Sequence, residues 1–125
     1  MSSVTVRYIV NDVHAAIAFY TQNLDFEVVM HPAPGFAALK RDALRLMLNA
    51  PGAGGAGTSL SDGTAPEPGG WNRFQIEVED LAATVEKLKN NGAHFRNEIV
   101  QGNGGKQILL EDPAGNPIEL LEPKK

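Results

Sequence analysis

Polar side chains that could carry chemistry alternate with apolar ones in two segments of the second half of the chain. In NRFQIEVE the side chains that face away from Phe74 and its apolar neighbours are Arg73, Gln75 and Glu77. Near the end of the chain, PIELLEP carries one inward carboxylate, Glu119. A carboxylate among further oxygen or nitrogen donors binds a divalent cation, whereas a carboxylate beside a guanidinium forms a charge-assisted hydrogen bond. The groups around Glu119 therefore decide which chemistry it serves.

The three histidines, His14, His31 and His94, are widely separated along the chain. No two of them have the i, i+4 spacing that places two imidazoles on one side of a helix. We interpret them as surface or rim histidines. The chain has no cysteine, which excludes disulfides, thiolate zinc sites and cysteine nucleophiles.

The composition limits the size and the partners of the protein. The 125 residues fit one compact domain, and 42% hydrophobic residues are enough to form a core. A net charge of −4 without a basic run argues against nucleic acid or an anionic membrane as a partner. The segment MSSVTVRYIV lacks the pattern of a secretory signal, and no apolar run approaches the roughly 20 residues of a membrane span. We expect a cytoplasmic protein.

The elements that must position the polar side chains occur twice. Residues 4–10 alternate as a strand, and Asp12 then occupies the N-cap position of an amphipathic segment. Residues 72–79 repeat the strand, and Asp80 repeats the cap. Three strand-like runs follow each helix, at 26–31, 36–40 and 44–49 and at 94–100, 106–111 and 117–122. We predict an α+β fold of two βαβββ modules.

The two modules are joined by a long connector. We assign residues 1–50 to module one, residues 51–70 to the connector and residues 71–125 to module two, all within a single domain. The connector is rich in glycine and proline, and we expect it to be either disordered or able to close over a ligand. Its GAGGAG run matches a dinucleotide-binding fingerprint, but no helix-forming segment follows it, so we interpret it as linker.

Three stretches resemble the vicinal oxygen chelate superfamily of glyoxalases, bleomycin resistance proteins and extradiol dioxygenases. They are VRYIVNDVHAAIAFYTQNLDFEVV (6–29), FQIEVEDLAATVEKLKNNG (74–92) and EDPAGNPIELLEP (111–123), in which DPxGNxIEL is the most specific mark. The resemblance implies that each module curls its strands into half a barrel and that two modules enclose a cavity. It also implies a homodimer with two cavities.

The resemblance further implies where a metal would bind. Catalytic members of the family hold a divalent ion with His, Gln or Glu side chains, and the first-strand ligand lies seven residues before the capping Asp. In this chain those positions are Thr5 and Arg73, and the last strand of module two supplies Glu119. Thr5 is a weak neutral donor, and Arg73 is a permanent cation that cannot coordinate a metal. We therefore predict no metal and no cofactor, and a pairing of Glu119 with Arg73.

In module one, the matching inward position on the last strand falls on one of three residues, none of which is a carboxylate or an imidazole: Arg45, Met47 and Asn49.

The side chains expected on the inward faces suit a small-molecule pocket, in which a few polar anchors stand among apolar walls. The predicted ligand-binding residues are Arg7, Phe36, Met47, Trp71, Arg73, Gln75 and Glu119. Trp71 serves either as a stacking wall or as a plug at the barrel edge.

These residues favour metal-independent binding of an aromatic natural product or antibiotic, by sequestration, as the resemblance to bleomycin resistance proteins implies. The paired arginines suit a planar, oxygen-rich or anionic ligand. Two alternatives stay open. One is a glyoxalase-like lyase or isomerase, or a dioxygenase, with an atypical site. The other is metal-free acid–base catalysis by Glu119 with Arg73 as the electrophile.

Overall fold

In a computed structural model that describes residues 4–125, the protein folds into a sheet of four strands and a sheet of five strands, each covered by one helix. The first sheet has the order β1-β4-β3-β2 and the second the order β5-β9-β8-β6, with β7 paired to β8. Module one contains β1 (Val4–Ile9), α1 (Val13–Asn23), β2 (Glu27–Ala33), β3 (Phe36–Arg41) and β4 (Leu44–Asn49). Module two contains β5 (Gln75–Glu77), α2 (Leu81–Asn90), β6 (His94–Phe95), β7 (Val100–Gln101), β8 (Gly105–Glu111) and β9 (Pro117–Pro123). The predicted α+β fold is confirmed.

Both helices begin where the capping aspartates predict. The Asp12 carboxylate accepts a hydrogen bond from the Ala15 N–H at 3.0 Å, and the Asp80 carboxylate accepts one from the Ala83 N–H at 3.0 Å. Each bond satisfies one of the donors that the first helical turn leaves without an intrahelical partner. The two predicted caps are therefore confirmed.

Two predicted strands are shorter than expected. Within residues 72–79, only Gln75–Glu77 forms a strand. Residues 94–100 do not form one continuous strand, because β6 ends at Phe95 and β7 begins only at Val100. In the second case the side-chain oxygen of Asn97 accepts the Leu109 N–H at 2.9 Å, in place of a backbone carbonyl. Side chains of this type compete with the sheet ladder in this way, and the strand is interrupted.

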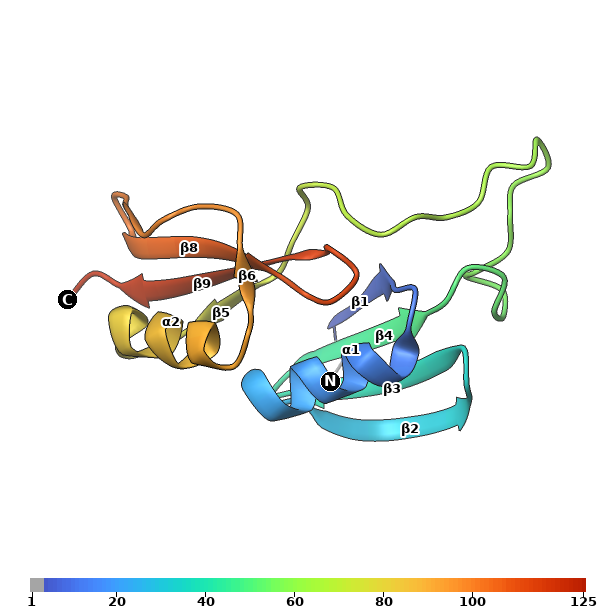
Figure 1. Cartoon of the computed structure of the whole chain (residues 1–125), viewed down its shortest axis with the longest axis horizontal. Helices are drawn as coiled ribbons and strands as arrows, with labels where there is room; N and C mark the ends of the chain where they lie inside the picture. Colours follow the sequence, from blue (N-terminus) through green and yellow to red (C-terminus); the bar gives the residue numbers. More distant parts are fainter. Residues whose placement is uncertain (1–3) are drawn as a thin grey trace.

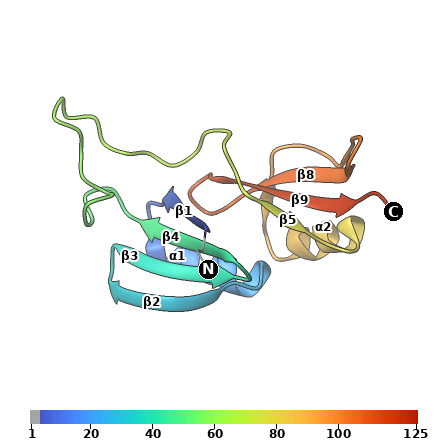
Figure 2. The same ribbon diagram turned by 180° about the vertical axis from the view of Figure 1, so that it is seen from behind.

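The helices cover one face of each sheet and leave the other face open. Leu46 and Leu48 of β4 and Ile118 and Leu120 of β9 are fully buried in the core beneath the helices. Since side chains of a strand alternate between faces, the intervening residues point to the helix-free side. Figure 1 shows α1 in front of the first sheet and α2 below the second, and Figure 2 shows the first sheet from its open side.

The two modules lie side by side, with β1 beside the turn between β8 and β9 and the start of β9 (Figures 1 and 2). The Tyr8 ring stacks on Phe74 with the ring centres 5.3 Å apart, and its hydroxyl donates to the Pro117 carbonyl at 2.7 Å. The Asn116 amide donates to the Ile9 carbonyl at 2.8 Å. The modules are thus joined at their edges, so the open faces of the two sheets are neighbours within one chain and do not stand opposite one another.

The connector leaves module one through a hydrogen-bonded turn and then runs extended to module two (Figure 1). Gly52 and Gly57 are linked by a backbone hydrogen bond of 2.7 Å within the turn. At the far end the Gly69 N–H donates to the Asn116 side-chain oxygen at 2.8 Å. Within residues 4–125, no helix has both the length and the apolar character needed to cross a membrane.

Candidate functional site

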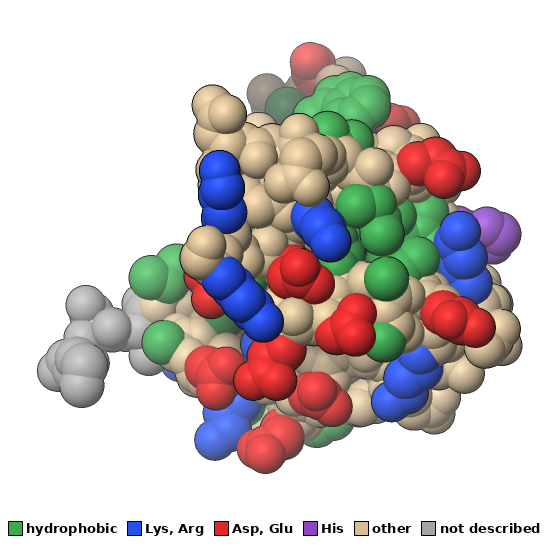
Figure 3. Space-filling model, turned by 90° about the vertical axis from the view of Figure 1, so that its left-hand side faces the viewer, with side chains coloured by type: hydrophobic (Ala, Val, Ile, Leu, Met, Phe, Trp, Pro, Cys, Tyr) green, Lys and Arg blue, Asp and Glu red, His purple; other side chains and the backbone are tan. Residues whose placement is uncertain are grey.

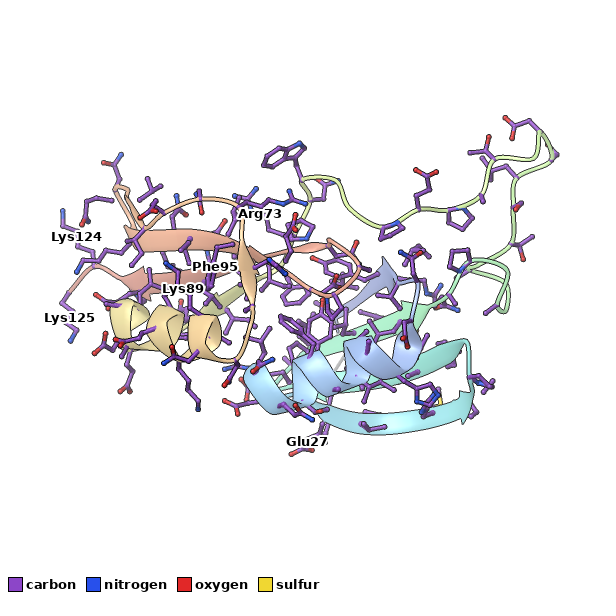
Figure 4. The ribbon with its side chains drawn as sticks, in the orientation of Figure 1. Glu27, Arg73, Lys89, Phe95, Lys124 and Lys125 are labelled. Atoms are coloured by element: carbon purple, nitrogen blue, oxygen red, sulfur yellow. The ribbon has the colours of Figure 1, made fainter. Side chains whose placement is uncertain are left out.

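A carboxylate held by two other side chains forms the centre of the open face of module two. Glu119 is only 8% exposed and lies opposite Gln75 in the register of β9 and β5. Arg73 donates from Nε and Nη2 to Oε1 of Glu119 at 3.0 and 2.8 Å, and Gln75 donates from Nε2 to Oε2 at 2.6 Å. Figure 4 shows Arg73 on the side of the sheet away from α2. The predicted pairing of Arg73 with Glu119 is confirmed.

The strand pattern of PIELLEP accounts for the position of this carboxylate. Ile118 and Leu120 turn into the core, so Glu119 between them must turn to the open face. On that face Glu119 lies between Gln75 of β5 and Leu109 of β8. The Glu119 N–H donates to the Phe74 carbonyl at 3.1 Å, which fixes the backbone next to Arg73.

These residues do not fit the divalent ion that catalytic members of the family hold. Both carboxylate oxygens of Glu119 already accept N–H donors, and two of these donors belong to Arg73, a permanent cation whose nearer nitrogen is 2.8 Å away. A metal ion would have to displace these hydrogen bonds against the charge of Arg73. It would then find no imidazole or second carboxylate in the cluster of Arg73, Gln75 and Glu119, whereas such ions need three or four convergent donors.

Module one repeats the geometry with different chemistry. Arg7 lies opposite Met47 in the parallel pairing of β1 and β4, just as Gln75 lies opposite Glu119 in that of β5 and β9. Met47 is therefore the structural counterpart of Glu119, which decides among the three alternatives that the sequence left open. The Arg7 guanidinium contacts the Met47 sulfur at 3.0 Å. A thioether is a weak acceptor, so Arg7 keeps most of its hydrogen-bonding capacity.

A second arginine makes this face cationic. Arg45 lies between Thr5 of β1 and Lys40 of β3 in the register of the first sheet. Within residues 4–125, neither Arg7 nor Arg45 is in an ion pair. The neighbouring Lys40, in contrast, lies 3.8 Å from the carboxylate of Glu27. The open face of module one thus offers two guanidinium groups to an external acceptor.

The predicted aromatic residues occupy different places. Phe36 is half-buried on the same face as Met47, two positions along β3 from Ala38, which is the register partner of Met47. Trp71 is 69% exposed at the end of the connector, and its carbonyl accepts from Arg73 at 3.2 Å. The fold thus brings Trp71, Arg73, Gln75 and Glu119 together on module two, and Arg7, Met47 and Phe36 together on module one.

One residue that the sequence reading missed, Arg96, orders the end of the connector. Its guanidinium lies 4.8 Å from the centre of the Trp71 ring. It donates to Glu111 at 2.8 Å, to the Gly70 carbonyl at 2.7 Å and to the Gly115 carbonyl at 3.0 Å. A cation held over an aromatic face is attracted to it, so Arg96 supports the Trp71 ring from one side. No spacing in the sequence indicates this role, because all of its partners lie elsewhere in the chain.

A buried carboxyl group connects the two modules. Asp112, in the DPAGN turn, accepts from the Tyr20 hydroxyl at 2.8 Å and from the Asn116 amide at 3.1 Å. Burial raises the pKa of Asp112 above its ordinary value, against the opposing effect of these hydrogen bonds. Burial likewise raises the pKa of Tyr20 well above its usual range and that of Tyr8 to about 12. The motif that marks the family in the sequence therefore also holds the modules together.

The surface at the module-two end mixes charges with apolar groups. Figure 3 shows acidic and basic side chains interspersed over this end, with hydrophobic side chains gathered in its upper right part. A small cleft of about 180 Å³ lies between the two modules. It is lined by residues of both, among them Leu24, Arg41, Ile76 and Lys87. Its lining comes from the helix-covered side, so it is separate from the open faces that carry Glu119 and Met47.

Comparisons with known proteins agree with this architecture. A probable chloroplastic lactoylglutathione lyase of Arabidopsis thaliana is 42% identical over 55 residues, which are 42% of this chain and 16% of that protein. The lactoylglutathione lyase of Escherichia coli O157:H7 is 32% identical over 56 residues, 43% of this chain and 42% of that protein. The match therefore spans less than half the length of either relative.

Solved structures cover nearly the whole chain at lower identity. TnmS3, an antibiotic binding protein from Streptomyces sp. CB03234, superposes with a TM-score of 0.74 at 19% identity, covering 99% of this chain and 97% of TnmS3. This likeness shows the fold. A sequence model of the Glyoxalase/Bleomycin resistance protein/Dioxygenase superfamily matches residues 3–120. With the paired βαβββ modules and the DPAGN turn, this match shows that the chain belongs to the glyoxalase/bleomycin resistance protein/dioxygenase superfamily.

Proposed function

We propose that this protein binds a planar, oxygen-rich or anionic aromatic small molecule without a metal, and that it acts by sequestering that molecule. The observation that carries the proposal is the state of Glu119, whose two oxygens are occupied by Arg73 and Gln75. The polar group at the centre of the module-two face is thus a fixed hydrogen-bonding anchor. Anchors of this kind among apolar walls are typical of small-molecule pockets.

The residues around this anchor suit such a ligand. Leu109 and Leu121 flank Glu119 on the same half-buried face and offer apolar contact. Trp71, supported on one side by Arg96, offers a ring for stacking. The guanidinium groups of Arg7 and Arg45 match carboxylate, sulfonate or phenolate oxygens, because their planar donors bind such groups in pairs. An anionic ligand is therefore favoured over a cationic one.

We propose that a homodimer completes the pocket. Each sheet leaves its helix-free face open within one chain, and a second copy can cover it. The open face of module one carries Arg7 and Arg45, whereas that of module two carries Glu77 in addition to Glu119, whose charge is balanced by Arg73. An excess of positive charge on one face would therefore meet an excess of negative charge on the other. Light scattering of the purified protein is expected to give the mass of two chains. TnmS3, named as an antibiotic binding protein, supports this function by analogy of fold alone.

The binding experiment uses protein treated with EDTA and titrated calorimetrically with an anthraquinone sulfonate, and then with a panel of uncharged and cationic planar aromatics. We expect saturable binding that EDTA does not change, with the sulfonate preferred. Trp71→Ala and Arg7→Ala should each weaken it about tenfold, a typical loss for a central contact. Lys125→Ala, at the end of the chain, should leave it unchanged. Absence of binding by every member of the panel would overturn the proposal.

A second candidate is an enzyme that transfers protons without a metal. It is favoured by the 42% identity of 55 residues to a probable lactoylglutathione lyase. In this case the Oε2 atom of Glu119, held only by Gln75, would exchange that hydrogen bond for one to a substrate. Incubation with glutathione and methylglyoxal distinguishes the candidates, because their hemithioacetal becomes lactoylglutathione when a proton moves from one carbon to the next. Formation of this thioester by EDTA-treated protein that disappears in Glu119→Gln would establish catalysis, whereas a pure binding protein gives none.

A further inference from the structure

Two histidines that are far apart in the sequence meet on the surface of module one. His14 lies in the first turn of α1, and His31 lies on the edge strand β2. Their ring centres are 5.0 Å apart, with 65° between the ring planes. Both side chains are exposed. His94, on β6 of module two, belongs to the other sheet.

We propose that His14 and His31 form a surface site for one divalent transition-metal ion of the borderline class, such as Cu²⁺, Ni²⁺ or Zn²⁺. Neutral imidazole nitrogens are the ligands that these ions favour. An ion bound to one nitrogen of each ring at about 2.0–2.1 Å, with a tetrahedral angle between them, places the ring centres about 5 Å apart. This is the separation observed. Exposed side chains change rotamer rapidly, so the rings can turn their nitrogens to a shared ion without a backbone shift.

The surroundings determine how strongly the site would bind. Among residues 4–125, no group of three or more His, Cys, Asp or Glu side chains is arranged to hold a metal. Two imidazoles and water would therefore complete the coordination, which predicts binding in the micromolar range or weaker. The site is independent of Glu119, because it belongs to the other module and uses neither open sheet face.

Occupation of the site would act on the most irregular pairing of the first sheet. The β2–β3 ladder is irregular twice, between Val28 and Met30 and between Met30 and Ala33, and His31 lies within the second irregular stretch. All residues of β2 are exposed. An ion shared with His14 would attach this stretch to the first turn of α1. Metal binding should therefore stabilise the folded protein, since an ion that binds only the folded state shifts the unfolding equilibrium.

The test uses the untagged chain in a buffer that does not bind metals. Calorimetric titration with Ni²⁺, and separately with Zn²⁺, should show one ion per chain. His14→Ala and His31→Ala should each weaken binding at least tenfold, and His94→Ala, the matched control, should bind as the wild type does. The melting temperature should rise on adding Zn²⁺ and return on adding EDTA, and this rise should be absent from the His14→Ala/His31→Ala variant.

The proposal is overturned if the untagged protein shows no saturable binding, or if His14→Ala and His31→Ala both bind as tightly as the wild type. Circular dichroism and the urea midpoint of each variant in EDTA establish that it is folded, so a loss of binding cannot be attributed to unfolding. The result is also separate from the proposed sequestering function, because the ligand titrations in EDTA do not depend on this ion.

Discussion

Arg73 directs two guanidinium nitrogens at one oxygen of Glu119, at 3.0 and 2.8 Å. The other oxygen accepts from Gln75, so the carboxylate is fully engaged by side chains of its own module. This arrangement turns a potential ligand for a cation into a rigid polar anchor. Removal of the guanidinium is consequently the most direct way to learn what the anchor contributes.

Arg73→Ala is expected to lower the free energy of unfolding by about 1–3 kcal/mol, because it leaves the carboxylate of Glu119 buried without its cation. The lower part of this range allows for solvent screening, since the Arg73 side chain is 33% exposed. Urea denaturation measures the loss. Lys40→Ala, which removes an exposed pair at 3.8 Å, is the control and should change stability by less than about 1 kcal/mol. Equal effects of the two substitutions would contradict the prediction.

Asp112 should make stability depend on pH in the unusual direction. Its pKa is raised by burial, so folding favours its protonated form. The contribution of Asp112 to the free energy of unfolding is therefore fully present below about pH 4, the pKa of an unfolded aspartate. It is lost as the pH rises through the folded-state pKa. The difference in the free energy of unfolding between the wild type and Asp112→Asn should fall over this interval.

Urea denaturation at a series of pH values gives this difference. Tyr20→Phe provides a second check, because it removes one of the hydrogen bonds that lower the pKa of Asp112. The fall should then extend to higher pH. A difference that grows as the pH rises would show that the hydrogen bonds outweigh burial.

The tyrosines should resist ionisation until the protein unfolds. The chain has only two tyrosines, Tyr8 and Tyr20, and both are buried. Burial raises the pKa of Tyr8 to about 12 and that of Tyr20 well above its usual range. Their contribution to stability is fully present below about pH 10, the pKa of an unfolded tyrosine, and is lost as the pH rises through the folded-state values.

An alkaline titration followed by phenolate absorbance tests this expectation. The native protein should show little phenolate up to about pH 11, whereas protein unfolded in guanidinium chloride should titrate near about pH 10. Circular dichroism recorded in parallel should show that phenolate forms together with unfolding. Ionisation of one tyrosine near its ordinary pKa in a protein that stays folded would refute the buried positions of these rings.

Gly105→Ala tests the β8–β9 pairing beneath the open face of module two. Gly105 has φ +140°, and a Cβ there would overlap the backbone oxygen of Glu122 on the adjacent strand. Because backbone cannot move aside cheaply, we expect a loss of about 1–3 kcal/mol or more in urea denaturation. The adjacent Gly104→Ala is the matched control, since its Cβ would meet nothing within 4 Å. Comparable stabilities of the two variants would contradict the structure at this position.

Local patterns determined much of the fold. Asp12 and Asp80 cap their helices as their positions before the apolar periodicity predict, because capping depends only on neighbours a few residues away. The alternation of PIELLEP similarly places the Glu119 side chain on the face of the sheet opposite to that of Ile118 and Leu120. The strand expected over 94–100 does not form as one piece, because the Leu109 N–H donates a hydrogen bond to the Asn97 side chain. The sequence does not indicate this contact, since Asn97 lies between β6 and β7 whereas Leu109 lies on β8.

The sequence by itself thus determined the two βαβββ modules, which follow from short-range patterns repeated along the chain. It also indicated the superfamily and the position of Arg73 near Glu119, which follow from the resemblance of three stretches to that superfamily. Only the tertiary structure decided that Met47 is the counterpart of Glu119, that Arg96 supports Trp71, and that His14 meets His31. The physical reason is that these relationships depend on strand register and on packing between separate elements. Register and packing arise when the whole chain buries its core, and no spacing in the sequence records them.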